Sequence, residues 1–169
     1  MEKVIKIILA DDHLLVRNGI KSLLLEDATL EVIGEASNGK EALELAKETQ
    51  PDLLIIDVRM PVMDGIEAAG HLKDYAPNTK SIVLSMHDSE EYILKSIKAG
   101  ASGYLLKDTG KEEFLKAIKT VFNGGKYFSG DISNVIVSNY LQTTSTTNPT
   151  VKTPKNTLGL TKKEIEILS

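Results

Sequence analysis

Short apolar segments alternate with segments of helical periodicity along most of this chain. The apolar segments have the length of strands, and several are apolar throughout, which is typical of strands covered on both faces. They occupy residues 4–10, 30–36, 52–57, 80–86 and 102–107. The segments between them place apolar residues on one helical face, as Val16, Ile20 and Leu23 do in the first. The pattern therefore predicts strand and helix in alternation, repeated five times.

This alternation predicts an α/β fold, in which a five-stranded parallel sheet has helices on both faces. We assign residues 1–124 to one doubly wound domain of this kind. Residues 125–141 carry a shorter helical pattern and predict one extra helix. Residues 142–158 are rich in Thr, Asn and Pro, which predicts a flexible linker. A new capped helix begins within residues 159–169.

Composition narrows the class of protein. The chain has 169 residues, a hydrophobic content of 41%, a charged content of 26% and a formal net charge of −4. These values are ordinary for a soluble globular protein and argue against one that is basic throughout. The absence of Cys excludes a disulfide framework and a thiolate metal site. The apolar runs are far shorter than the ~20 residues of a membrane span, so we expect a cytoplasmic protein without a membrane partner.

Chemically active side chains follow four of the predicted strands. Asp11 and Asp12 follow the first strand, Asp57 ends the third, Ser85 ends the fourth and Lys107 ends the fifth. In an open parallel sheet, ligands bind beyond the carboxyl ends of the strands. If the strand order is 2-1-3-4-5, the first and third strands are neighbours and these side chains converge on one edge.

The chemistry of this set suits a phosphoryl group. Three carboxylates so close together repel one another unless a cation joins them, and oxygen ligands suit a hard divalent ion such as Mg²⁺. Lys107 and Ser85 can donate hydrogen bonds to anionic oxygens. A carboxylate can itself attack phosphorus and form an aspartyl phosphate. Asp57, on the central strand, is the candidate nucleophile.

Four segments resemble the receiver domain of two-component response regulators: LADDHLLVRNGI, LLIIDVRMPVMDGIEA, IVLSMH and GASGYLLKD. The resemblance covers residues 4–124, and DDHLLVRNG is similar to the NarL/LuxR-type (FixJ-like) subclass in particular. It implies a flavodoxin-like fold and the transfer of a phosphoryl group from a sensor histidine kinase to Asp57. The protein would then be a phosphorylation-controlled switch and not an enzyme, apart from slow autodephosphorylation.

The same resemblance implies a metal site. Asp12, Asp57 and the backbone carbonyl of Arg59 would bind Mg²⁺, and Asp11 would help through a water molecule. The side chain of Arg59 would also tune the lifetime of the phosphoryl group. We assign no metal to His13, because no second ligand stands at a recognisable spacing from it, and we place it at the start of the first helix.

The resemblance further implies a switch. Lys107 would pair with the phosphoryl group, and Ser85 would move to one of its oxygens while Tyr104 turns inward behind it. Met86 and His87 would tune the lifetime of the phosphoryl group, Met86 by crowding its entrance. The sequence leaves open whether phosphorylation acts by homodimerisation, by unmasking an output domain or by both.

Two other functions fit the sequence less well. A Mg²⁺-dependent phosphohydrolase of the haloacid-dehalogenase type needs an Asp two residues after its nucleophile, where this chain has Arg59. Residues 34–40 match the G-x-x-x-x-G-K pattern of a nucleotide-binding P-loop, but Glu41 stands where Ser or Thr is needed. We therefore interpret this stretch as the cap of the second helix. A phosphorylation-independent interaction module usually lacks one of the acids or the lysine, and all are present here.

The stretch LTKKEIEIL, within residues 159–169, resembles the opening helix of a LuxR-type helix-turn-helix domain. By this resemblance the parent protein would be a transcription factor that binds DNA through that domain. Because the chain stops at Ser169, we expect it to be a truncated piece that does not itself bind DNA.

Overall fold

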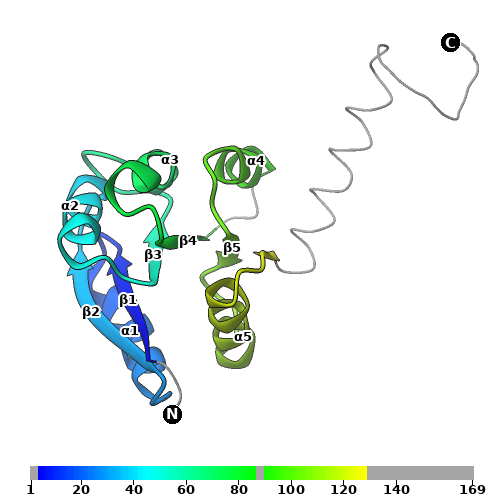
Figure 1. Cartoon of the computed structure of the whole chain (residues 1–169). Coiled ribbons are helices and arrows are strands. Elements are labelled where there is room, and N and C mark those ends of the chain that lie inside the picture. Colours follow the sequence, from blue (N-terminus) through cyan, green and yellow to red (C-terminus); the bar gives the residue numbers. More distant parts are fainter. Residues whose placement is uncertain (1–3, 87–89, 129–169) are drawn as a thin grey trace, which may run out of the picture. The chain divides into compact units, whose positions relative to one another are not determined.

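The computed structural model describes residues 4–86 and 90–128 (Figure 1). Strands and helices alternate as the sequence predicts, and the five predicted strands have their expected bounds to within one residue. In chain order the elements are β1 (Ile5–Ala10), α1 (Leu14–Leu25), β2 (Leu30–Ala36), α2 (Gly39–Thr49), β3 (Leu53–Asp57), α3 (Gly65–Tyr75), β4 (Lys80–Ser85), α4 (Glu90–Lys98), β5 (Gly103–Leu106), α5 (Lys111–Phe122) and β6 (Tyr127–Phe128).

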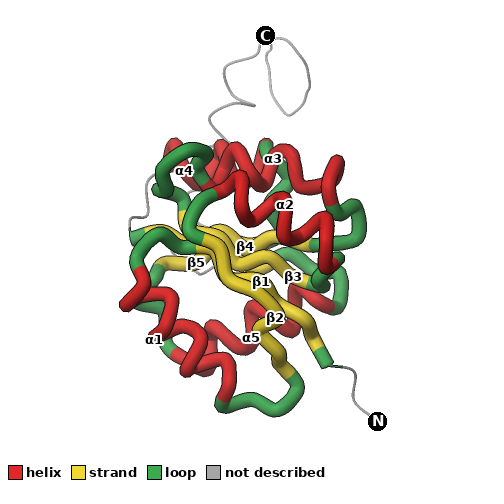
Figure 2. The backbone as a smooth tube through the Cα atoms, turned by 90° about the vertical axis from the view of Figure 1, so that its left-hand side faces the viewer, coloured by secondary structure: helices red, strands yellow, loops and turns green. Residues whose placement is uncertain are grey.

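The strands form one parallel sheet in the order β2-β1-β3-β4-β5-β6. Helices α1 and α5 cover one face of the sheet, and α2, α3 and α4 cover the other (Figure 2). This arrangement confirms the doubly wound α/β prediction and the order 2-1-3-4-5. It also places the carboxyl ends of β1 and β3 side by side, because these two strands pair directly.

The sheet has one strand more than predicted. Tyr127 and Phe128 form β6, which pairs in parallel with Gly103 and Tyr104 of β5. The pairing begins where the backbone N–H of Tyr127 donates to the carbonyl of Ser102 at 3.0 Å. A strand of two residues is too short to leave a periodic pattern, so the prediction of five strands was wrong at this edge of the sheet.

The central strands are buried on both faces, as their continuous apolar sequence predicts. Every residue of β3 is buried, and in β4 only the first residue is exposed. Leu53 and Ile55 join a core cluster with Phe114 and Ile118 of α5. The intervening residues of β3 point to the opposite face and are equally buried. Burial of each large apolar side chain stabilises the fold by about 1.5–3 kcal/mol, so the sheet is a rigid base for its carboxyl edge.

The stretch that matches the P-loop pattern is a helix cap, as predicted. Asn38 is the N-cap of α2, and its side-chain oxygen accepts from the backbone N–H of Glu41 at 2.9 Å. Glu41 in turn accepts from the backbone N–H of Ser37 at 3.0 Å. Gly39 has a tertiary role, because a Cβ there would lie 2.5 Å from the carbonyl oxygen of Met63. The glycine therefore lets the loop after β3 approach the start of α2.

Several predictions concern residues outside the described ranges. The linker over residues 142–158, the helix start within residues 159–169 and the lifetime residue His87 all lie there, as does most of the extra helix predicted within residues 125–141. In the part of the chain that the structure describes, no helix combines the length and the apolar character needed to cross a bilayer.

Candidate functional site

The carboxyl edge of the sheet brings together the side chains that the sequence singled out. Asp11 and Asp57 are buried, with 2% and 4% of their surface exposed. The Lys107 ammonium lies between them, 2.9 Å from Asp11 Oδ2 and 3.2 Å from Asp57 Oδ1. The Lys107 side chain is itself only 8% exposed. Residues far apart in sequence therefore form one buried ionic cluster, with two carboxylates facing one ammonium.

Burial and charge shift the pKa values of this cluster. Burial raises the pKa of the Asp57 carboxyl above its ordinary value, the Lys107 charge opposes that change, and the Asp11 charge adds to it. Burial alone would lower the pKa of the Lys107 ammonium, but its hydrogen bond to Asp11 and the Asp57 charge outweigh burial and raise it. The lysine is therefore firmly cationic. It cannot neutralise Asp11, Asp12 and Asp57 together, so the site favours a further cation.

The raised pKa of Asp57 predicts how stability depends on pH. Between the ordinary value of 3.8 and the higher folded-state value, the folded protein binds more protons than the unfolded chain. Stability therefore falls as pH rises through that interval, and the ionised Asp57 destabilises the fold at neutral pH. We expect Asp57→Asn to raise the melting temperature at neutral pH and to lose this advantage below pH 3.8.

Thermal unfolding at neutral pH and at a pH below that interval measures this effect. Asp74→Asn is the matched control, because Asp74 is an exposed carboxylate on α3 and its replacement should leave both melting temperatures unchanged. A lower melting temperature for Asp57→Asn at neutral pH would mean that its ion pair with Lys107 outweighs the cost of its burial.

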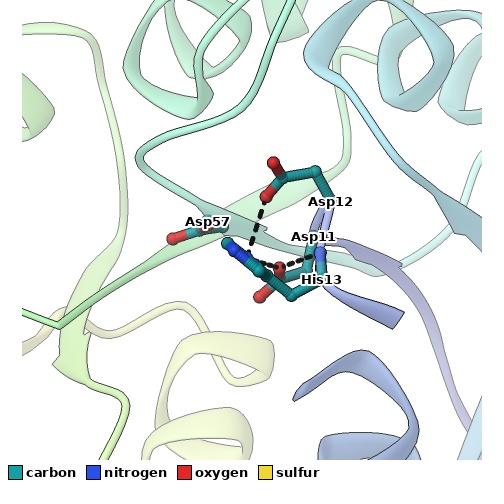
Figure 3. Close-up of side chains that lie close together, drawn as sticks. All are labelled: Asp11, Asp12, His13 and Asp57. Carbon is teal, nitrogen blue, oxygen red and sulfur yellow. Dashed lines mark hydrogen bonds and ion pairs between the residues drawn. The ribbon is translucent and has the colours of Figure 1, made fainter. Parts of the chain in front are cut away.

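Four side chains at this edge could share a metal ion. Ligand atoms of Asp11, Asp12, His13 and Asp57 all lie within 4.8 Å of one another (Figure 3). Asp11 and Asp57 are on the buried side of this cluster, whereas the Asp12 side chain is 29% exposed and opens it to solvent. Three carboxylates with access from solvent fit a hard divalent cation that keeps some of its waters.

His13 is a member of this cluster that the sequence interpretation left out. It stands at the N-cap of α1, as expected, but its side chain makes no capping hydrogen bond. Its Nδ1 lies 3.1 Å from Asp12 Oδ1 and 3.3 Å from Asp11 Oδ1. In the sequence, the only indication of this contact was that His13 directly follows Asp11 and Asp12. Spacing rules for metal ligands overlook it, because they look for ligands one or more turns apart.

Arg17 is a second residue that sequence reasoning missed. Its Nη1 donates to the backbone carbonyl of Asp11 at 2.6 Å, and its Nε donates to Glu35 Oε1 at 2.9 Å. Lys21 also pairs with Glu35, at 2.9 Å. The first turn of α1 thus reaches back and joins the carboxyl ends of β1 and β2. This contact fixes the main chain of Asp11, whose Oδ1 also accepts from the backbone N–H of His13 at 2.8 Å.

The main chain of Asp57 is fixed by the start of α3. The backbone N–H of Gly65 donates to the carbonyl of Val58 at 2.9 Å, and the Val58 N–H donates to the carbonyl of Leu84 on β4 at 3.0 Å. A Cβ on Gly65 would lie 2.0 Å from the carbonyl oxygen of Asp57. Asp64 caps the helix, since its Oδ1 accepts from the backbone N–H of Glu67 at 2.7 Å.

The remaining predicted site residues surround this cluster. Ser85 is buried at the end of β4, and its carbonyl accepts from the backbone N–H of Lys107 at 2.8 Å. Tyr104 is fully buried, so its side chain already lies inside the domain. Met86 is 71% exposed. Arg59 is exposed and lines a surface groove that runs between the loop after β3 and α4.

Comparison with known protein families identifies the family of this chain. Residues 7–119 match the response regulator receiver domain. The chain belongs to the response regulator receiver family. The match spans every residue of the carboxyl-edge cluster, from Asp11 to Lys107, and it confirms the resemblance drawn from the sequence segments.

The chain is similar to transcriptional regulatory proteins and to a solved response regulator of the LuxR family. The chain is 37% identical over 139 residues to the transcriptional regulatory protein DegU of Brevibacillus brevis, covering 82% of this chain and 59% of DegU. It is 38% identical over 164 residues to the transcriptional regulatory protein YxjL of Bacillus subtilis, covering 97% of this chain and 73% of YxjL. A LuxR-family two-component response regulator from Aurantimonas sp. SI85-9A1 superposes with a TM-score of 0.77 at 32% identity, covering 82% of this chain and 99% of that one. The chain thus spans less than two thirds of DegU.

Proposed function

We propose that this receiver accepts a phosphoryl group on Asp57 from a sensor histidine kinase. The observation that carries the proposal is the buried Asp57 carboxylate, held 3.2 Å from the Lys107 ammonium at the carboxyl edge of the sheet. Burial favours the nucleophile, because a desolvated carboxylate is more reactive than a hydrated one. The nearby ammonium favours transfer, because charge on the phosphoryl oxygens is compensated at once.

Asp11, Asp12, Asp57 and the backbone carbonyl of Arg59 would hold Mg²⁺. The three carboxylates offer oxygen ligands, which this ion prefers, and they lie within reach of one another. Bound there, Mg²⁺ supplies charge neutralisation and fixes the orientation of the transferred group. Asp12 is the most exposed of the three acids and would be the entry point for the hydrated ion.

In the transfer step, a carboxylate oxygen of Asp57 attacks phosphorus and an acyl phosphate forms. The bond between phosphorus and the donor atom breaks, and that atom leaves with its electron pair and takes up a proton. For a histidine kinase the broken bond is a P–N bond. Lys107 then exchanges its contact with Asp57 for one with a phosphoryl oxygen, while its contact with Asp11 at 2.9 Å keeps the ammonium in place. Ser85 contributes its hydroxyl to a second phosphoryl oxygen.

The signal would leave the site through Ser85 and Tyr104. Tyr104 lies on β5, which pairs with β4, the strand that ends in Ser85, and α4 and α5 are the helices before and after β5 in the chain, so movement of the pair would reach these elements. The output would be control of transcription by a DNA-binding domain of the parent protein, since the relatives DegU and YxjL are transcriptional regulatory proteins. Homodimerisation on phosphorylation and release of the output domain both remain compatible with this path. The protein would act in the cytoplasm and would hydrolyse only its own acyl phosphate, slowly.

The lifetime of the acyl phosphate would depend on side chains at the rim of the site. Arg59 stands two residues after Asp57, and Met86 directly follows Ser85. Both side chains are exposed. A bulky apolar side chain at position 86 hinders an attacking water more than a small one, so we propose Met86 as a brake on hydrolysis. Arg59 and His87 complete the proposed set of lifetime-tuning residues.

Phosphorylation by a small phosphodonor tests this function. We expect acetyl phosphate to add one phosphoryl group per chain in the presence of Mg²⁺, as measured by intact mass. Chelation of the metal should abolish the addition, and fresh Mg²⁺ should restore it, because three acids without a cation repel the incoming anion. Equal addition with and without the chelator would contradict the proposed metal site. No addition under any condition would contradict the function itself.

A further inference from the structure

His13 has a side chain that no part of the proposed function uses. Its ring is 66% exposed, yet Nδ1 is turned toward the carboxylates instead of the solvent (Figure 3). The backbone N–H of His13 is held by Asp11 Oδ1 at 2.8 Å, so the residue has a fixed place at the head of α1. The ring does not cap that helix. In the structure the ring is held by the two acids, because Nδ1 lies within hydrogen-bond distance of Asp11 Oδ1, at 3.3 Å, and pairs with Asp12 Oδ1 at 3.1 Å.

The hydrogen-bond distances around Nδ1 are also close to the distances between neighbouring ligands on one metal ion. With metal–ligand bonds of about 2.1 Å, adjacent ligand atoms lie about 3.0 Å apart on an octahedron and about 3.4 Å apart on a tetrahedron. The ring nitrogen lies 3.1 Å from Asp12 Oδ1 and 3.3 Å from Asp11 Oδ1. An ion could thus join the nitrogen to both carboxylates with small movements of the side chains. Asp57 belongs to the same group of ligand atoms.

The type of ligand atom decides which metal ion binds more tightly. Mg²⁺ is bound through oxygen and gains little from an imidazole. Imidazole nitrogen suits Zn²⁺, Ni²⁺ and other late first-row ions, whose affinity for mixed nitrogen and oxygen sites exceeds that of earlier ions. A cluster of three carboxylates and one imidazole therefore selects metal ions differently from a site with oxygen ligands alone.

We propose that His13 Nδ1 is a fourth ligand of the carboxyl-edge site and makes this receiver bind late first-row dications, with Zn²⁺ as the test ion, in competition with Mg²⁺. The proposal rests on the proposed function in one respect, because it assumes that the metal of phosphoryl transfer binds at the same carboxylates. Binding of Zn²⁺ then places an ion with a nitrogen ligand where Mg²⁺ is needed. The availability of such ions would thereby regulate the site.

The test isolates His13 as the sole imidazole. The chain has three histidines, so the double variant His71→Ala/His87→Ala retains only His13, and the triple variant that adds His13→Ala has none. We expect Zn²⁺ to bind the wild type and the double variant with similar affinity in calorimetric titrations at neutral pH. The triple variant should bind Zn²⁺ about tenfold more weakly or worse, as expected for the loss of a metal-site group. Its Mg²⁺ affinity should change less than about twofold, because the oxygen ligands remain.

A spectroscopic measurement separates ligation from a mere effect on the shape of the site. Cu²⁺, a late first-row ion, bound to the double variant should show the electron spin echo modulation characteristic of a coordinated imidazole, and the signal should vanish in the triple variant while Cu²⁺ stays bound. Absence of this modulation in the double variant would overturn the proposal, as would equal Zn²⁺ affinity of the double and triple variants. Mg²⁺-dependent phosphorylation is measured on the wild type alone. The proposed function and this inference can therefore fail separately.

Discussion

Replacement of Asp57 by Asn is expected to abolish phosphorylation by acetyl phosphate, lowering Mg²⁺-dependent addition by at least about 100-fold. The reason is chemical, because the amide oxygen of Asn is a poor nucleophile toward phosphorus and cannot form an acyl phosphate. The amide still fills the same buried volume and can still accept a hydrogen bond from Lys107, which lies 3.2 Å away in the wild type. Loss of the reaction therefore reports on the nucleophile and not on the architecture of the site.

Three controls accompany this experiment. Asp74→Asn alters an exposed carboxylate on α3 and should leave phosphorylation at the level of the wild type. The melting temperature of Asp57→Asn, which we expect to be higher than that of the wild type at neutral pH, shows whether unfolding causes the loss. Hydroxylamine should release the phosphoryl group from the wild type, because an acyl phosphate is labile to it and a serine phosphoester is not. Undiminished phosphorylation of Asp57→Asn would mean that another residue is the acceptor. Asp11, Asp12 and Ser85 would be the nearest candidates.

The sequence predicted the carboxyl-edge cluster because the cluster follows from topology. The ends of parallel strands meet at one edge whatever the details of packing, so Asp11, Asp57 and Lys107 could be brought together from their positions alone. The helix caps Asn38 and Asp64 were predictable for a similar reason. A cap depends on three or four consecutive residues, and its hydrogen bond stays within that stretch.

The features that escaped prediction depend on tertiary approach. Arg17 reaches the Asp11 carbonyl only because α1 packs against the sheet at a particular angle, which no local pattern encodes. The contact of His13 Nδ1 with Asp12 depends on the orientation of one side chain. β6 consists of two residues and exists because β5 offers it a free edge. Gly39 and Gly65 look like ordinary helix-start residues in the sequence, yet each is required by a carbonyl of another segment.

Gly65 should therefore be the glycine with the largest effect on the fold and on the site together. A Cβ at this position would lie 2.0 Å from the carbonyl oxygen of Asp57 and 2.8 Å from its carbonyl carbon. Both atoms belong to the main chain of a buried strand, so the contact cannot be relieved by rotating a side chain. We expect Gly65→Ala to lower the free energy of unfolding by about 2–4 kcal/mol, as overpacking of a core does. Urea denaturation measures the change.

Helix propensity predicts the opposite sign, which makes this substitution informative. Ala is favoured over Gly within a helix by about 0.5–1 kcal/mol. Gly70→Ala, in the same helix, is the matched control, since its nearest neighbour would be the Cβ of Ala99 at an ordinary 3.8 Å. That variant should gain roughly the 0.5–1 kcal/mol of propensity while Gly65→Ala loses several times as much. Equal stabilisation by both would mean that the loop after β3 yields easily.

Gly65→Ala should also affect the site, because the added Cβ must displace part of the main chain. If the start of α3 cannot retreat, because the Gly65 N–H is bonded to the Val58 carbonyl at 2.9 Å, the main chain of Asp57 must move instead. Its carboxylate then shifts relative to Asp11, Asp12 and Lys107, and the Mg²⁺ affinity of the folded Gly65→Ala protein should fall while that of Gly70→Ala stays unchanged. Calorimetric titration with Mg²⁺, under conditions where both variants are fully folded, distinguishes this coupling from a general loss of stability.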